Sequence, residues 1–226
     1  MAEPDMRGLR VVLAGTAEAP LLEATAEAFR EVGCLVASGD VLPEPPEGMD
    51  ICVCFARPAP GDPLAEADPA TWELSLEREL MGPLRLARTA ARSMSARSGG
   101  SVVIVGTLDA IHAYPARSVA SVAMGGLLGW VRSTGVELAG QGVRANLVLA
   151  GPLGDAEGRA PGGTAVALLD RTLLRSPLHR LGRPKEAAAA IRFVAGPDAG
   201  FMTGQTLRVD GGWASLNQAP EGMRFP

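Results

Sequence analysis

Several residue types that recur in enzyme active sites are scarce in this chain of 226 residues. Aromatic residues make up 4% of the sequence, and tyrosine, lysine, histidine and asparagine are all rare. They occur at Tyr114, Lys185, His112, His179, Asn146 and Asn217. An active site that combines a tyrosine, a lysine and an asparagine must therefore draw on Tyr114, Lys185 and one of two asparagines.

Cysteine is also scarce, with residues at Cys34, Cys52 and Cys54 only. Three cysteines are too few to form a disulfide framework, and an odd number cannot all pair within one chain. No histidines and cysteines are spaced as metal ligands, so we expect no metal site. Cys52 and Cys54 alternate onto one face of an apolar run and are expected in the core rather than as nucleophiles.

The chain lacks a basic stripe and a long apolar run. Its formal net charge is −4, its pI is near 5.3 and its arginines are scattered, which argues against nucleic acid as a partner. The longest apolar stretch, 119–131, is too short to span a bilayer and contains glycines. Acidic residues precede the first apolar run, the reverse of a secretory signal, so we expect a soluble cytoplasmic protein without a membrane segment.

Short β-like runs alternate with longer helical patterns along the chain. Strands are expected at 9–14, 34–38, 50–55, 101–105, 143–149 and 205–209, and helices at 21–32, 69–94, 118–139 and 185–195. This alternation predicts an α/β fold with a parallel sheet, in one domain over residues 1–226. The segment 151–164 is expected to form a flexible loop, and 214–226 a C-terminal tail.

Three segments resemble a known family. The VELA run at 136–139, followed by GVRAN at 142–146, matches a helix, a turn and a strand of that family. The LGRP run at 181–184 matches the start of the helix that follows the family's substrate loop. The segment from TGQT to VDGGW, at 203–213, matches the family's last strand and the residues after it. In this order they resemble the short-chain dehydrogenase/reductase family. The resemblance implies a Rossmann-like, three-layer, doubly wound parallel sheet, with 151–164 as a remnant of the substrate loop.

The resemblance places a nicotinamide cofactor at an altered turn after the first strand. Family members bind it through a TGxxxGxG turn, whose glycines let the backbone approach the pyrophosphate at a helix N-terminus. The three glycines fall here on Thr16, Pro20 and Leu22. Pro20 also removes an N–H donor, and Glu18 adds a negative charge where phosphates would lie.

The segment after the second strand is short. Asp40 stands where the family often places an acid that binds the adenosine ribose, and Cys54 aligns with the first Asn of the family's NNAG motif. The 13 residues 41–53 between them cannot hold the strand and flanking helices found there in relatives. We therefore expect a truncated sheet, Asp40 as a vestige, and no cofactor, NAD(P) included.

The family's catalytic tetrad of Asn, Ser, Tyr and Lys is largely replaced. Aligned on the VELA run, its positions hold Glu79, Thr107, Ala120 and Met124 in that order. Neither alanine nor methionine transfers protons, so hydride transfer by the family mechanism is not expected. The first hypothesis is accordingly a pseudoenzyme, a non-catalytic structural or regulatory subunit.

A second hypothesis keeps an enzyme. Thr107, Asp109, His112 and Tyr114 follow the strand whose carboxyl end faces the family's substrate cleft. They offer groups for a cofactor-independent lyase, isomerase or cyclase that reuses this cleft for a small-molecule ligand. The same residues are compatible with ordinary loop hydrogen bonds. A third hypothesis is an NAD(P)-dependent oxidoreductase with atypical cofactor binding.

Association is expected through two helices. Relatives pair through the helices that correspond to 69–94 and 118–139, and both keep apolar stripes here. Gly125, Gly126 and Gly129 permit close approach of a neighbouring helix. The stripes also suit packing on the chain's own sheet, so a homo-oligomer, or a hetero-oligomer with an active relative, is a hypothesis.

Overall fold

The computed structural model describes residues 5–39, 48–56, 66, 68–97, 99–160 and 175–215. The strands are β1 (Arg10–Gly15), β2 (Leu35–Gly39), β3 (Ile51–Phe55), β4 (Gly100–Thr107), β5 (Val143–Ala150) and β6 (Thr206–Val209). The α-helices are α1 (Ala19–Arg30), α2 (Pro69–Leu76), α3 (Gly82–Ser95), α4 (Ser118–Glu137) and α6 (Pro184–Ala195).

The strands form one parallel sheet in the order β2-β1-β3-β4-β5-β6. β1 pairs with both β2 and β3, so the direction of winding reverses between β1 and β3. Central strands are apolar at almost every position because both faces are covered; all of β3, including Cys52 and Cys54, is buried. The carboxyl ends of the parallel strands meet at one edge, where open α/β sheets bind ligands.

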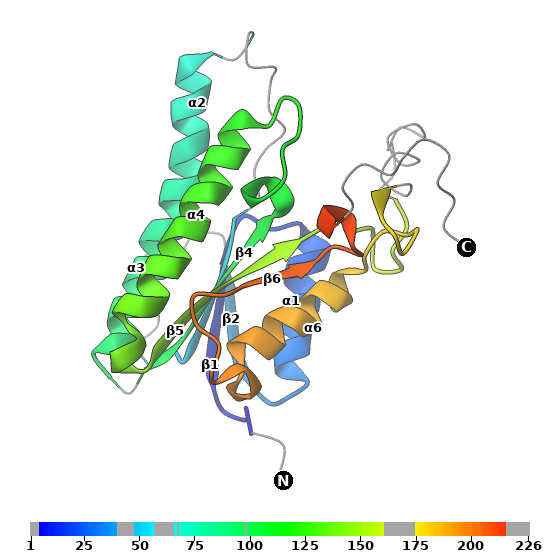
Figure 1. Cartoon of the computed structure of the whole chain (residues 1–226). Coiled ribbons are helices and arrows are strands. Elements are labelled where there is room, and N and C mark those ends of the chain that lie inside the picture. The colour runs from blue at the N-terminus through cyan, green and yellow to red at the C-terminus, as the bar shows by residue number, and fades with distance from the viewer. Residues whose placement is uncertain are drawn as a thin grey trace.

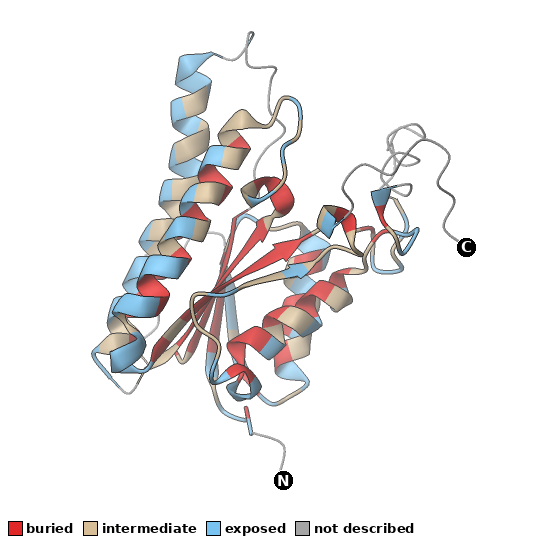
Figure 2. Ribbon diagram, viewed as in Figure 1, coloured by how far each residue is buried: buried red, intermediate tan, exposed pale blue. Residues whose placement is uncertain are grey.

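Helices cover both faces of the sheet, giving three layers (Figure 1). α3 and α4 lie on one face, over a core that includes Met94, Met124 and Leu127. α1 and α6 lie side by side on the other face, over a core that includes Phe29 and Ile191. Figure 2 shows that burial is concentrated in the strands and in the helix faces turned toward them. Within the described ranges, no helix is long and apolar enough to cross a membrane.

Local sequence signals explain where two of the helices begin. The Asp68 carboxylate accepts a hydrogen bond from the Thr71 N–H at 3.3 Å, and a proline occupies the first turn of α2. At the start of α6, the Glu186 carboxylate accepts from the Arg183 N–H at 2.7 Å, again with a proline in the first turn. Both helices thus satisfy N–H groups that would otherwise lack partners.

The predicted α/β class and parallel sheet are confirmed, and most predicted elements lie within a few residues of the observed ones. The described sheet ends at β2, on the side where the missing strand was predicted. The helix expected over 69–94 differs, because a π-helical turn, η1 (Glu77–Met81), separates α2 from α3. Asp40, residues 161–164 of the predicted loop and residues 216–226 of the predicted tail lie outside the described residues.

Candidate active site

The carboxyl end of β4 holds a buried carboxylate. β4 ends at Thr107, and a 3-10 turn, η2 (Leu108–Ala110), places Asp109 beside it. The Thr107 hydroxyl donates a hydrogen bond to Asp109 Oδ2 at 2.5 Å. Arg117, next to the start of α4, donates to Asp109 Oδ1 at 3.0 Å and to Oδ2 at 2.9 Å. The Asp109 side chain is 3% exposed, so the guanidinium offsets the cost of burying its charge.

A second buried carboxylate, Glu79, acts on the same guanidinium. It lies in the π-helical turn, its side chain is 3% exposed, and its Oε1 is 3.8 Å from Arg78 Nη2. The pKa of Arg117 is raised, chiefly by its hydrogen bonds to Asp109 and further by the charges of Asp109 and Glu79. We refer to Thr107, Asp109, Arg117 and Glu79 as the acidic network.

Two aromatic rings follow the acidic network along the chain. The rings of His112 and Tyr114 meet edge to face, with centroids 4.8 Å apart. Tyr114 is half-buried and packs against the core that includes Met124 and Leu127. Burial is the main cause that raises the pKa of Tyr114; the charge of Asp109 adds to it, whereas the Trp213 indole and nearby guanidinium groups oppose it. Tyr114 therefore carries its proton at neutral pH.

Arg175 brings a further cation to these rings. Its guanidinium carbon lies 5.4 Å from the centroid of the Trp213 ring, and its Nη2 lies 3.1 Å from His112 Nε2. Trp213 is buried, and within the described part of the chain its indole nitrogen has no hydrogen-bond partner. We refer to His112, Tyr114, Arg175 and Trp213 as the aromatic cluster.

The structure brings the four predicted site residues to one edge of the sheet, Thr107 and Asp109 in the acidic network and His112 and Tyr114 in the aromatic cluster. The three partners that sequence reasoning missed are Arg117, Arg175 and Trp213. The chain has 20 arginines, 21 basic residues less one lysine, so no single arginine stands out. Trp213 could have been found from the sequence, because it is the last residue of the VDGGW motif.

The aligned positions of the family's tyrosine and lysine lie in the core. Ala120 is 4% exposed and Met124 is fully buried. A Cβ on Gly106 of β4 would lie 2.9 Å from the Met124 sulfur, so this side chain packs directly on the strand. The single lysine, Lys185, is exposed on α6, in the opposite helix layer. Neither aligned position can transfer a proton, and Lys185 does not replace them.

The turn between β1 and α1 is where the family resemblance places a diphosphate. Gly15 has a φ of +101°, and a Cβ there would lie 2.2 Å from the Phe55 carbonyl oxygen. Only glycine fits this position. The tight turn that directs the chain from the strand into the helix is therefore retained.

The donors at the start of α1 are few. The Glu18 carbonyl accepts hydrogen bonds from the N–H groups of Leu21, at 3.0 Å, and Leu22, at 3.1 Å. Pro20, in the first turn, has no N–H. Glu18, the residue that precedes the first turn, also adds a carboxylate at this helix start, which disfavours a phosphate there. These residues do not fit a diphosphate held in the usual manner of a glycine-rich turn.

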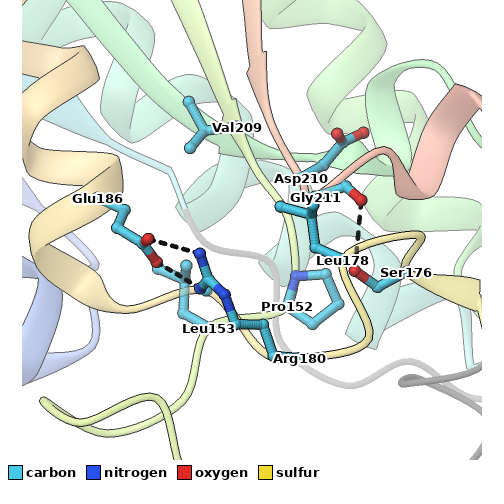
Figure 3. Close-up of a pocket in the computed structure, with 10 residues that line it drawn as sticks. Pro152, Leu153, Ser176, Leu178, Arg180, Glu186, Val209, Asp210 and Gly211 are labelled. Atoms are coloured by element: carbon cyan, nitrogen blue, oxygen red, sulfur yellow. Dashed lines mark hydrogen bonds and ion pairs between the residues drawn. The ribbon is translucent and has the colours of Figure 1, made fainter.

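A pocket lies at the carboxyl ends of β5 and β6 (Figure 3). Its apolar lining comprises Pro152, Leu153, Leu178 and Val209. Arg180 donates to the two oxygens of Glu186 at 2.8 and 2.7 Å. These bonds, with others from Arg183, lower the pKa of Glu186 to about 2. Ser176, also in the lining, directly follows Arg175 in the chain, so the pocket borders the aromatic cluster.

Comparison with known proteins identifies the family of this chain. A protein-family model described as enoyl-(acyl carrier protein) reductase matches residues 6–214. The chain belongs to the short-chain dehydrogenase/reductase family. Within this family, cis-4-hydroxycyclohexanecarboxylate dehydrogenase of Sinomonas cyclohexanicum is 34% identical over 169 residues, which are 74% of this chain and 67% of that protein.

Two further short-chain dehydrogenases/reductases illustrate the range of similarity. The 3-oxoacyl-(acyl-carrier-protein) reductase of Vibrio cholerae is 31% identical over 73% of this chain and 66% of its own length. The chain thus spans about two thirds of the length of these curated relatives. The structure of gluconate 5-dehydrogenase from Burkholderia cenocepacia, in complex with NADP and tartrate, has a TM-score of 0.78 at 22% identity, over 93% of this chain and 97% of that one. This likeness shows the shared fold.

Two expectations drawn from the sequence are wrong. The pseudoenzyme hypothesis is contradicted because relatives and structural neighbours are named as dehydrogenases and reductases; the cofactor-independent enzyme is not favoured either. The expectation of no cofactor is contradicted by membership of the short-chain dehydrogenase/reductase family and by neighbours with bound NADP. The first inference rested on a few aligned positions, and the second on these and on the short segment 41–53, whereas the carboxyl edge also holds Tyr114 and two arginines that they do not represent.

Proposed function

We propose that this chain is an oxidoreductase that interconverts a carbonyl and a hydroxyl group at the carboxyl end of β4, with Tyr114 transferring the proton. The observation that supports this most directly is the position of Tyr114. It is a half-buried phenol next to His112, and its pKa responds to charges in both the acidic network and the aromatic cluster. This is the edge of the sheet at which the fold binds ligands.

The substituted tetrad positions support a relocated proton donor. Ala120 and Met124 have no group that titrates, and both are buried. Tyr114 is the only tyrosine of the chain, and it belongs to the segment that joins β4 to α4. We infer that the phenol reaches the substrate from this segment rather than from α4 itself.

The protonated state of Tyr114 at neutral pH suits one direction of proton transfer. A protonated phenol can donate its proton to a carbonyl oxygen as that oxygen gains negative charge. At neutral pH the group is therefore poised as an acid, which suits reduction of a carbonyl. In the reverse direction the phenolate would accept the proton of the alcohol, and Arg117 and Arg175 favour that charged form.

Thr107 acts as a positioning residue in this proposal. Its hydroxyl proton is engaged with Asp109, which is itself held by Arg117. The oxygen of Thr107 therefore faces the site as an acceptor, not as a donor to a substrate carbonyl. The acidic network orients the segment that carries His112 and Tyr114.

A nicotinamide dinucleotide is the redox partner that the family supports, and in family members it supplies or accepts the hydride. The turn between β1 and α1 does not fit its diphosphate in the usual manner, because Pro20 lacks an N–H and Glu18 carries a negative charge. A bound dinucleotide would take its contacts from other parts of the carboxyl edge. Binding is therefore the first property to measure.

Calorimetric titration with NADH and NADPH, followed by assays with a panel of aldehydes and ketones, tests the proposal. We expect binding of one or both nucleotides and carbonyl-dependent oxidation of the nucleotide. Absence of both nucleotide binding and turnover across the panel would contradict it. Measuring binding separately from turnover distinguishes a missing substrate from a missing cofactor site.

Tyr114→Phe tests the assigned proton donor. Loss of the hydroxyl should lower kcat about 100-fold or more, with nucleotide binding retained. Lys185→Met is the matched control, because it removes the only lysine of the chain from an exposed position on α6. Equal activity of Tyr114→Phe and the parent would remove Tyr114 from the mechanism.

We also propose that the chain self-associates through α2, α3 and α4. Exposed apolar side chains on or beside these helices support this, among them Leu74, Val122 and Val136. Light scattering on a sizing column gives the oligomeric state, and Val122→Glu should shift it toward the monomer. A monomer at all accessible concentrations would contradict self-association.

A further inference from the structure

Arg175 has hydrogen-bond donors at the mouth of the site that no carboxylate of the described residues uses. Its guanidinium carbon lies over the Trp213 ring, 5.4 Å from the ring centroid, and its Nη2 lies 3.1 Å from His112 Nε2. A guanidinium held over an aromatic ring can still donate hydrogen bonds from its other N–H groups. The side chain is exposed, so these donors are accessible to a ligand.

The neighbouring charged side chains differ from Arg175 in this respect. Arg117 is held by Asp109, and Arg180 by Glu186. Asp210 adjoins Trp213 in sequence, and its carboxylate accepts hydrogen bonds from the N–H groups of Gly212, at 2.9 Å, and Ala214, at 3.0 Å. Among the described residues Arg175 makes no ion pair, so its charge at this edge is not neutralised.

We infer that Arg175 binds a carboxylate carried by the substrate, and that the substrate is therefore a short keto or hydroxy acid. This inference rests on the proposed oxidoreductase function, which requires a carbonyl or hydroxyl group near Tyr114. A planar guanidinium matches a carboxylate with two parallel hydrogen bonds. The Trp213 ring lies beside the guanidinium at cation–π distance.

The spacing within the aromatic cluster sets the size of the ligand. His112 contacts both residues: its Nε2 is 3.1 Å from Arg175 Nη2, and its ring centroid is 4.8 Å from that of Tyr114. Because both residues contact one imidazole ring, we infer a short separation between a carboxylate at Arg175 and a carbonyl oxygen at Tyr114. Such a separation fits an acid whose carbonyl group lies within a few bonds of its carboxylate.

His112 also restricts the chemistry of the acid site. Because Arg175 can only donate, His112 Nε2 is the acceptor of their contact, and the neutral ring then carries its proton on Nδ1. The imidazole holds the guanidinium edge without adding a negative charge that would compete with the ligand. The apolar wall formed by Pro152, Leu178 and Val209 leaves room nearby for an alkyl chain.

Equilibrium binding of matched acid and ester probes tests the inference. Pyruvate and methyl pyruvate, and acetoacetate and methyl acetoacetate, are titrated while ligand-observed NMR and tryptophan fluorescence are recorded. We expect each acid to bind about tenfold or more tightly than its ester, because a hydrogen-bonded charge pair is lost in the ester. Equal binding of acid and ester by the parent would overturn the inference.

Variants of Arg175 identify the residue responsible. Arg175→Met keeps a chain that can cover Trp213 but removes the charge, and should weaken acid binding about 10- to 100-fold while ester binding stays within about twofold. Arg175→Lys keeps the charge and should bind the acids more weakly than the parent but more tightly than Arg175→Met. Arg208→Met, on the exposed face of β6, has the same net charge change and should bind as the parent does. Unchanged acid binding in a folded Arg175→Met protein would overturn the assignment.

The remaining outcomes separate this inference from the proposed function. Methyl phosphate serves as a third probe, and its binding in place of the carboxylates would replace the assigned ligand class. Turnover of neutral ketones without any preference for acids would overturn the carboxylate site and leave the oxidoreductase function standing. Acid binding that depends on Arg175, with no turnover of any carbonyl compound, would overturn the oxidoreductase function alone.

Discussion

Arg117 donates hydrogen bonds to both carboxylate oxygens of Asp109, across the segment that joins β4 to α4. This contact closes a loop whose interior residues include His112 and Tyr114. The two aromatic side chains have no secondary structure of their own to hold them, since they lie between η2 and α4. Their position therefore depends on the ion pair at the base of the loop.

Arg117→Met should destabilise the fold markedly. It leaves the Asp109 carboxylate buried with Thr107 as its remaining side-chain donor, and breaking a buried pair costs about 3 kcal/mol in the free energy of unfolding. Urea denaturation measures the change. Arg7→Met is the control, because it breaks the exposed Asp5–Arg7 pair and should leave the urea midpoint nearly unchanged. Similar midpoints for the two variants would show that the Asp109 pair is not structural.

Met124→Lys should not restore the family's usual lysine. The Met124 side chain is fully buried against Gly106, so an ammonium group there would be desolvated in an apolar environment. We expect a loss of about 3 kcal/mol or more in the free energy of unfolding. Met124→Leu keeps the apolar volume and should cost less than about 1.5 kcal/mol. Thermal and urea unfolding of both variants test the comparison, and a stable Met124→Lys protein would contradict it.

Gly15→Ala and Gly125→Ala should have opposite effects. At Gly15 the backbone has a positive φ and a Cβ would meet the Phe55 carbonyl oxygen, so alanine should cost more than about 2 kcal/mol. At Gly125, within α4, a Cβ meets no atom within 4 Å, so alanine should stabilise the helix by about 0.5–1 kcal/mol. Denaturation midpoints of the two variants give the signs. If both substitutions changed the free energy of unfolding in the same direction, either the positive φ at Gly15 or the open surface at Gly125 would be contradicted.

Acid should weaken the contact at the start of α6 within a defined pH window. The hydrogen bonds from Arg180 and Arg183 lower the pKa of Glu186 to about 2 from its ordinary value of 4.5. Because the folded pKa is the lower one, this stabilisation is present above pH 4.5 and is lost as the pH falls toward 2. After allowance for solvent screening it amounts to about 1 kcal/mol.

Acid titration of unfolding free energy in Glu186→Gln tests this window. The variant should lack the part of the pH dependence that the parent shows between pH 4.5 and about 2. Glu23→Gln, at an exposed position on α1, is the control and should keep that dependence. Superimposable acid profiles of Glu186→Gln and the parent would exclude the contribution.

The sheet could be predicted from the sequence because its central strands are buried on both faces. Such strands appear as short apolar runs, of which ICVCF in β3 is the clearest. The π-helical turn could not be predicted, since its residues fit an α-helix equally well in composition and spacing. The turn packs against α4 and buries Glu79, and a local pattern does not report such tertiary contacts.

The candidate site was only partly accessible to sequence reasoning. Thr107, Asp109, His112 and Tyr114 lie within one short segment, so their proximity follows from the position of a single strand end. Arg175 comes from a segment 63 residues from His112, and nothing local relates the two. The wrong expectation about the cofactor had a similar origin. Altered residues in the turn between β1 and α1 show which hydrogen-bond donors that turn offers, but not which donors the rest of the carboxyl edge of the sheet offers.

The π-helical turn has a consequence for insertions and deletions. A π turn is an α-helix with one additional residue, so α2 and α3 differ in rotation by roughly 100° from a continuous helix. Within the turn Glu79 is buried, whereas Glu77 faces solvent and pairs with Arg85. Deletion of one residue from 77–81 would let the helix close into a regular α form and turn α2 about its axis, and Glu79 would move away from Arg117. The position of the Glu79 carboxylate near the site thus depends on the number of residues in the segment 77–81 as much as on the identity of residue 79.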